Sequence, residues 1–285
     1  MVRLPFWKMH GLGNDYIVID NRNGILENGA LPSIAKRLCR RRFSIGADGL
    51  LLLYNSSTAD VKMRIFNADG SEAEMCGNGI RCLAKYCYEN GIVCKSVMDI
   101  ETLAGVRRVW LHINDGKVAS VTVDMGSPIF DRKGIPALGE GKFIDESINV
   151  NGETFKATCL SIGNPHCVIF VDDVASFPVE YYGPRIEKHA LFPKRINVEF
   201  VQIIRPDLVK VRVWERGVGE TFACGTGACA SVVAGRVLGM LSDECLVELL
   251  GGNLRVRYDE ASNRIFLTGL AEKVYEGVVE LEVLP

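Results

Sequence analysis

Two stretches of this chain repeat one sequence frame about half a chain length apart. Residues 64–79 read RIFNADGSEAEMCGNG and residues 212–227 read RVWERGVGETFACGTG, an ungapped match at an offset of 148. Both keep Arg, an aliphatic and an aromatic residue at the start, a Glu, and Cys-Gly-x-Gly at the end. A second pair, GNDYIVI at 13–19 and GNPHCVI at 163–169, recurs at an offset of 150. Two motifs in the same order indicate that one structural unit was duplicated.

The duplication predicts two halves of similar fold. We expect residues 1–125 together with 270–285 to form the half that carries Cys76, and residues 126–269 to form the half that carries Cys224. A length of 285 residues suits two domains of ordinary size. The chain is expected to cross between the halves at 124–128.

The residue pattern indicates an α+β fold with largely antiparallel sheets. Short β-branched or aromatic runs, bounded by polar residues, Gly or Pro, predict strands. These runs are 15–20, 61–66, 118–124, 167–171, 198–204 and 209–214. A helix is expected after each Cys-Gly-x-Gly, because apolar residues follow at helical spacing. The second of these helices, 228–238, is apolar nearly all round and is therefore expected to be buried.

A third helix is expected at 33–43, with Ser33 as its N-cap. The basic run Arg40–Arg42 within it could contact an anion, but we interpret it as a solvated helix face.

Charge and targeting signals narrow the possible partners. The net charge of −2 argues against nucleic acid as an obligatory partner. The N-terminal residues lack the apolar core of a signal peptide, and no apolar stretch reaches the length of a membrane span. We therefore expect no membrane association and a cytoplasmic location.

Ten cysteines without a CxxC pair indicate reduced thiols rather than a zinc ribbon, a thioredoxin-type motif or a disulfide framework. Eight of them are expected to be core residues. These are Cys39, Cys82, Cys87, Cys94, Cys159, Cys167, Cys229 and Cys245.

Cys76 and Cys224 differ from the others because each stands at the entrance of a predicted helix. Unpaired N–H groups and the helix dipole stabilise a thiolate there, and the glycines let an anionic ligand approach. Two such sulfurs on opposite sides of one ligand would suit stereoinversion at carbon, with one removing a proton and the other returning one. That chemistry requires no metal or pyridoxal cofactor, and the sequence offers no metal-ligand cluster. A structural role for the duplicated cysteines remains an alternative, and His166 and Glu215, taken alone, are most simply structural.

Several longer motifs resemble those of the diaminopimelate epimerase family, in the order of that family and over almost the whole chain. They are KMHGLGND at 8–15, FNADGSE at 66–72, MCGNG at 75–79, GNPH at 163–166, ERG at 215–217 and ACGTG at 223–227. The resemblance implies cofactor-independent interconversion of LL- and meso-2,6-diaminopimelate in lysine and peptidoglycan precursor biosynthesis. It also implies two α+β halves, each a curved sheet around a central helix, with the active site in the cleft between them.

The resemblance assigns roles by position. Cys76 and Cys224 correspond to the acid–base pair, while His166 and Glu215 correspond to residues that tune the thiol pKa values. The substrate contacts implied are Asn14, Asn67, Gly77, Asn78, Asn164, Asn197, Glu215, Arg216, Gly225 and Thr226. Family members are typically homodimers, and Tyr275 resembles a tyrosine at the dimer contact. Gly49 departs from the pattern, because some members carry a ligand-binding glutamine there.

Two other functions remain open at this stage. A racemase of another amino acid would keep the fold and change the substrate, while isomerases of the phenazine-biosynthesis type resemble the fold but lack the cysteine pair. The ten cysteines also suggest a thiol redox protein, for which reactivity toward peroxide would be the distinguishing observation.

Overall fold

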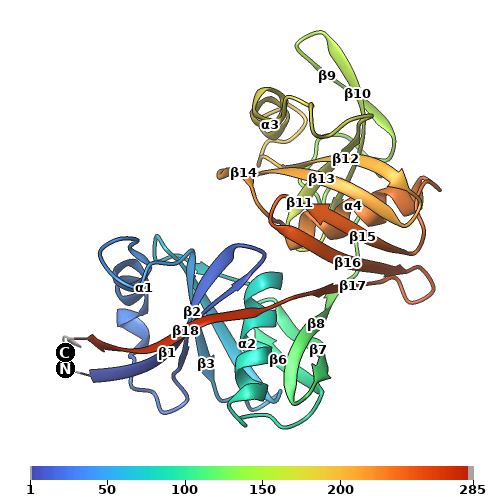
Figure 1. The fold of residues 1–285 in the computed structure, drawn as a ribbon. Helices are drawn as coiled ribbons and strands as arrows, with labels where there is room; N and C mark the ends of the chain where they lie inside the picture. Colours follow the sequence, from blue (N-terminus) through green and yellow to red (C-terminus); the bar gives the residue numbers. More distant parts are fainter. Residues whose placement is uncertain (1, 282–285) are drawn as a thin grey trace. The chain divides into compact units, whose positions relative to one another are not determined.

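The computed structural model describes residues 2–281, which fold as two compact units (Figure 1). The first takes in the chain up to Val123 and again from Gly269, and the second is Asp124–Thr268. The repeat placed the corresponding boundaries at 125/126 and 269/270.

Within residues 2–281, the first unit contains two α-helices, a short 3-10 helix and more residues in strands than in helices. Its elements are β1 (Val2–Gly11), β2 (Asn14–Asp20), η1 (Asn28–Ala30), α1 (Leu31–Cys39), β3 (Gly49–Tyr54), β4 (Val61–Asn67), β5 (Glu72–Ala73), α2 (Gly77–Glu89), β6 (Val97–Thr102), β7 (Gly105–Asn114), β8 (Lys117–Gly126, which runs on past the boundary) and β18 (Glu272–Leu281).

The second unit repeats this order. Its elements are β9 (Glu146–Val150), β10 (Glu153–Ser161), β11 (Pro165–Phe170), α3 (Val179–Glu187), β12 (Asn197–Arg205), β13 (Leu208–Glu215), β14 (Gly219–Thr221), α4 (Gly225–Val237), β15 (Glu244–Leu249), β16 (Gly252–Asp259) and β17 (Arg264–Gly269).

Strand pairing is the same in the two units. The parallel pairs β2–β3 and β4–β6 of the first correspond to β11–β12 and β13–β15 of the second. Most other pairings are antiparallel, as in the hairpins β3–β4 and β12–β13. The α+β class with mainly antiparallel sheets is therefore confirmed, and each strand predicted from sequence overlaps an observed one.

One helix occupies the centre of each unit (Figure 1). Helix α2 contacts β1, β2, β3, β4 and β7, and α4 contacts β10–β13, β15 and β16. Ten of the 13 residues of α4 are buried, as its uniformly apolar composition predicted. Both helices begin directly after the repeated cysteine, so the two entrances occupy equivalent places in the duplicated fold.

The predictions for the third helix were partly wrong. Helix α1 begins at Leu31, because η1 leads directly into it and Pro32 suits its first turn. Ser33 is therefore inside the helix, where its hydroxyl donates to the carbonyl of Ala30, and it is not the N-cap. The helix ends at Cys39, so Arg40–Arg42 lies in the following turn and not on a helix face.

Two further observations differ from expectation. Helix α3 was not predicted, because Gly183 and Pro184 within it are poor helix formers. Cys94 is exposed in the loop after α2, where no apolar face covers it, so its prediction as a core residue was wrong. The longest helices within residues 2–281 have 13 residues, and none of the described helices has the length and apolarity of a transmembrane span.

Candidate functional site

The first unit places Cys76 at the N-cap of α2. Its backbone is extended (φ −141°, ψ 125°), and Gly77, Asn78 and Gly79 form the first helical turn. The N–H groups of a first turn have no carbonyl partner within the helix and can bind an anion. A Cβ on Gly79 would lie 3.1 Å from Leu51 Cδ2, so glycine allows the helix entrance to approach β3 closely.

Polar side chains from β2 surround Cys76. Tyr16 Oη lies 2.9 Å from Cys76 Sγ and also donates to Asn14 Oδ1. Asn14 Oδ1 accepts from Asn78 Nδ2 at 3.2 Å, and Asn14 Nδ2 donates to Asp48 Oδ2 at 2.9 Å. These contacts bring Asn14 and Asn78, both predicted substrate contacts, to the same helix entrance as Cys76.

A network of ion pairs holds Asp48, the residue that accepts a hydrogen bond from the Asn14 amide. Arg41 Nη2 contacts Asp15 Oδ1 at 2.5 Å and Asp48 Oδ1 at 2.9 Å, and Lys8 Nζ contacts Asp15 Oδ2 at 2.5 Å. Burial acts to raise the pKa of Asp15, but hydrogen bonds from Arg41 and Lys8 outweigh it and hold the pKa at about 2. Arg41 therefore joins an ion-pair network, contrary to the prediction that the basic run is merely solvated.

Asn67 stands at the end of β4, opposite Gly49 in the β3–β4 register, and its amide donates to Ser71 Oγ at 2.9 Å. Gly49 has no side chain to bind a ligand, and a Cβ there would lie 3.2 Å from Tyr16 Cε1. The Tyr16 ring thus occupies the space beside Gly49.

The second unit places Cys224 at the N-cap of α4. Gly227 N donates to Cys224 Sγ at 3.4 Å, and Thr226 Oγ1 lies at the same distance from the sulfur. Asn164 Nδ2 donates to Thr226 Oγ1 at 3.2 Å. Gly225, Thr226 and Asn164, three of the substrate contacts implied by the family resemblance, therefore lie together at this helix entrance.

His166 is fully buried between two acceptors. Its Nδ1 lies 2.7 Å from Glu199 Oε1, and its Nε2 lies 2.9 Å from Asn164 Oδ1. Both ring nitrogens face oxygen atoms that accept hydrogen bonds, an arrangement that suits an imidazolium paired with the Glu199 carboxylate.

Glu199 was not identified from the sequence. Its side chain has no exposed surface, and within residues 2–281 its Oε2 has no hydrogen-bond partner. A Cβ on Gly227 would lie 2.8 Å from Glu199 Oε1, so this carboxylate directly adjoins the entrance of α4. The signal was available in the repeat, because Glu199 takes the place of Leu51, which belongs to the apolar strand β3.

Burial and two carboxylates keep Cys224 protonated. Burial raises the pKa of the Cys224 thiol well above its ordinary value, and the charges of Glu215 and Glu199 raise it further. Burial also raises the pKa of Glu215, although a hydrogen bond from Thr221 at 2.6 Å opposes the shift. The thiol is consequently the stable form of Cys224 in this environment.

The remaining predicted contacts of the second unit are held by backbone bonds. Asn197 Nδ2 donates to the carbonyl of Pro165 at 2.7 Å, and its Oδ1 accepts from Arg216 N at 2.9 Å.

His166 and Glu215, the two residues predicted to tune thiol pKa values, both belong to the unit of Cys224. Tyr275 lies on β18 of the first unit, 44% exposed, with its ring edge-on to Phe6.

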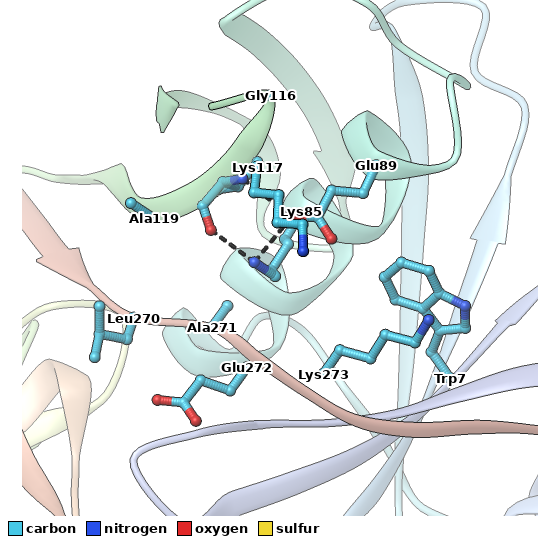
Figure 2. A pocket seen from close by; sticks show the side chains of 11 residues that line it. Trp7, Lys85, Glu89, Gly116, Lys117, Ala119, Leu270, Ala271, Glu272 and Lys273 are labelled. Atoms are coloured by element: carbon cyan, nitrogen blue, oxygen red, sulfur yellow. Dashed lines mark hydrogen bonds and ion pairs between the residues drawn. The ribbon is translucent and has the colours of Figure 1, made fainter. Parts of the chain in front are cut away.

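A pocket of about 700 Å³ lies in the first unit, outside the cluster around Cys76 (Figure 2). Two of its three lysines have partners: Lys85 Nζ bonds the carbonyl of Val118 at 2.6 Å and Glu89 at 2.9 Å, and Lys273 Nζ lies 3.7 Å from the centre of the Trp7 ring. Among residues 2–281, no group of three or more His, Cys, Asp and Glu side chains is arranged to hold a metal ion.

Comparison with solved structures shows the fold. A phenazine biosynthesis protein of the PhzF family from Bacillus anthracis superposes with a TM-score of 0.71 at 18% identity, covering 99% of this chain and 100% of the other. A hydroxyproline epimerase from Agrobacterium vitis gives a TM-score of 0.70 at 16% identity, covering 97% and 92%.

Sequence comparison shows the family. The family model described as diaminopimelate epimerase matches residues 6–130 and 158–274. The diaminopimelate epimerases of Moorella thermoacetica and Acetivibrio thermocellus are each 50% identical to this chain, covering 98% and 99% of it and 100% of the relatives. The chain therefore belongs to the diaminopimelate epimerase family.

Proposed function

We propose that this protein interconverts LL- and meso-2,6-diaminopimelate by two-base proton transfer between Cys76, Cys224 and the α-carbon. The observation that carries the proposal is the placement of both cysteines at the N-cap of the central helix in duplicated units. Family membership at 50% identity over nearly the whole chain supports the substrate and the reaction class, isomerisation.

The proposed reaction requires the two sulfurs to begin in opposite protonation states. The raised pKa of Cys224 supports the thiol as its resting form, which leaves the thiolate to Cys76. For the isomer whose α-hydrogen faces Cys76, the thiolate removes the α-proton, and the Cys224 thiol returns a proton on the other face. The reverse reaction starts from the opposite protonation states, so no net proton is consumed in a cycle.

The carbanion formed between these steps requires stabilisation. Its charge would spread into the substrate carboxylate, and the unpaired N–H groups at the entrances of α2 and α4 are suited to hold a carboxylate. Gly77, Gly225 and Thr226 stand in those first turns. The amide and charged side chains proposed to hold the rest of the substrate are Asn14, Asn67, Asn78, Asn164, Asn197, Glu215 and Arg216.

Conversion of LL-diaminopimelate to the meso isomer by the purified chain tests the function. Replacing Cys76 or Cys224 by Ala should lower kcat by about 100-fold or more, because each removes one acid–base group. Cys94→Ser is the matched control, since this thiol is exposed in a loop, and it should keep full activity. Conversion of proline or hydroxyproline in preference to diaminopimelate would instead favour a different amino-acid racemase.

We further propose that the protein is a homodimer in the cytoplasm. The exposed ring of Tyr275 on β18 supports a contact between copies at this strand. Light scattering should give twice the chain mass for the native protein and a smaller mass for Tyr275→Ala, and cell fractionation tests the location.

A further inference from the structure

The hydroxyl of Tyr16 is a buried group in direct contact with a reacting atom of the proposed mechanism. Tyr16 is 4% exposed, and its Oη lies 2.9 Å from Cys76 Sγ. The proposed function assigns this hydroxyl no role. Its position in the repeat is that of His166 in the second unit.

The ring of Tyr16 is held in place by the strand beside it. Tyr16 is opposite Gly49 in the parallel β2–β3 register, and a Cβ at Gly49 would lie 3.2 Å from Tyr16 Cε1 and 3.3 Å from Cδ1. At the equivalent position of the second unit, His166 is opposite Asn197, which has a side chain. The absence of a side chain at Gly49 therefore gives the Tyr16 ring the space in which its hydroxyl reaches Cys76.

The single proton of the hydroxyl has two acceptors within reach. One is Cys76 Sγ, and the other is Asn14 Oδ1, with which Tyr16 Oη also forms a hydrogen bond. Asn14 is itself fixed, because Asp48 and Asn78 bond its amide at 2.9 and 3.2 Å. Rotation about the C–O bond can thus redirect the proton without movement of any heavy atom.

We propose that Tyr16 is a catalytic residue that stabilises the thiolate of Cys76 by donating a hydrogen bond to its sulfur. When Cys76 takes the α-proton of the substrate, the Tyr16 proton turns to Asn14 Oδ1 and the new S–H donates to Tyr16 Oη. One C–H bond breaks and one S–H bond forms in this step, and Tyr16 keeps its own proton throughout. The proposal rests on the proposed role of Cys76.

The electrostatic surroundings keep the hydroxyl protonated. Burial raises the pKa of Tyr16 well above its ordinary value, and a negative charge on Cys76 and the carboxylate of Asp48 raise it further. Cys76 is the N-cap of α2, Cys82 lies within α2, and Asp48 is the residue before β3. Tyr16 is consequently a donor to the sulfur over the whole range in which a cysteine titrates.

Alkylation of Cys76 without substrate tests the proposal separately from epimerisation. The full chain and its Tyr16→Phe variant are treated with iodoacetamide between pH 5 and 10, and the rate at Cys76 is measured by peptide mass spectrometry. Phe keeps the ring over Gly49 and removes only the hydroxyl. The half-maximal pH for Cys76 should rise by about one to two units, the size expected for loss of a hydrogen bond to a charged group.

Two controls make the result specific. Tyr86→Phe removes the hydroxyl of another buried tyrosine of the same unit and should leave the Cys76 profile unchanged. The alkylation rate of the exposed Cys94 should depend on pH in the same way in all variants. If Tyr16→Phe folds poorly, Gly49→Ala is the second variant. Its Cβ would lie 3.0 Å from Phe66 O and 3.2 Å from Tyr16 Cε1, and displacement of the ring should raise the half-maximal pH for Cys76 as well.

An unchanged Cys76 profile in Tyr16→Phe overturns the proposal, even if Cys76→Ala has lost epimerase activity. A higher half-maximal pH for Cys76 in Tyr16→Phe upholds the hydrogen bond to the thiolate. This holds even if epimerase activity survives in Cys76→Ala and the proposed function fails. In the active enzyme, the pH at which kcat/KM falls on the acid side should rise together with the half-maximal pH for alkylation of Cys76.

Discussion

The buried pair of His166 and Glu199 makes a quantitative prediction. Their side chains have no exposed surface and meet at 2.7 Å, so removing one partner leaves the other buried without its counter-charge. Such a loss costs about 3–5 kcal/mol, and part of it is recovered when the histidine is neutral. We expect Glu199→Gln to lower the free energy of unfolding by about 2–3 kcal/mol, since Gln can still accept one hydrogen bond.

A double-mutant cycle in urea isolates the pair. Glu199→Gln, His166→Gln and the double variant should give a coupling energy of at least about 1.5 kcal/mol. The same cycle on Arg205 and Asp207, whose side chains are 61% and 56% exposed, should give about 0.5 kcal/mol or less. Equal coupling in the two cycles would refute the reasoning that His166 is held as an ion pair beside Cys224.

Three further predictions concern single residues. Asp48→Ala removes the 2.9 Å acceptor that holds the Asn14 amide, and steady-state kinetics should show KM raised by about 5- to 10-fold with a smaller change in kcat. Asp15→Asn should lower the free energy of unfolding by about 2 kcal/mol at pH 7. Because the folded-state pKa of Asp15 is about 2 and its ordinary value is 3.8, that difference should disappear as the pH falls from 4 to 2 in acid-unfolding curves. Gly227→Ala places a Cβ 2.8 Å from Glu199 Oε1, and thermal unfolding should show a loss of about 1–3 kcal/mol. Gly29→Ala is the control, because a Cβ at this exposed glycine meets no atom within 4 Å and its backbone is not left-handed.

The repeat allowed the arrangement of each unit to be predicted in advance. A frame that ends in Cys-Gly-x-Gly fixes a strand before the cysteine and a helix after it, and both appear at Cys76 and Cys224. Single-sequence patterns failed where local preference and tertiary packing disagree. Helix α3 forms despite Gly183 and Pro184 because Tyr182 and Ile186 pack into the core of its unit.

The side chains that surround the two sulfurs were harder to predict from the sequence than the fold. The contacts of Glu199 with His166 and of Tyr16 with Cys76 depend on strand register, and neither residue belongs to a motif that by itself suggests catalysis. The repeat already aligned Tyr16 with His166, and extending the comparison to the next strand would have shown Glu199 where Leu51 stands. Positions where the two halves of a duplication carry different residues, as here, indicate where the charges around the two cysteines differ.

The distribution of isotope at low conversion tests the two-base claim most directly. LL-diaminopimelate is incubated in D₂O, and the α-hydrogen of both isomers is measured by mass spectrometry before a tenth of the substrate has reacted. Two-base transfer gives meso product that carries deuterium, while recovered LL substrate keeps its hydrogen, because the proton is removed on one face and a solvent-derived one is added on the other. Deuterium in the recovered LL isomer at the same rate as in the product would contradict it, since a single group would then serve both faces.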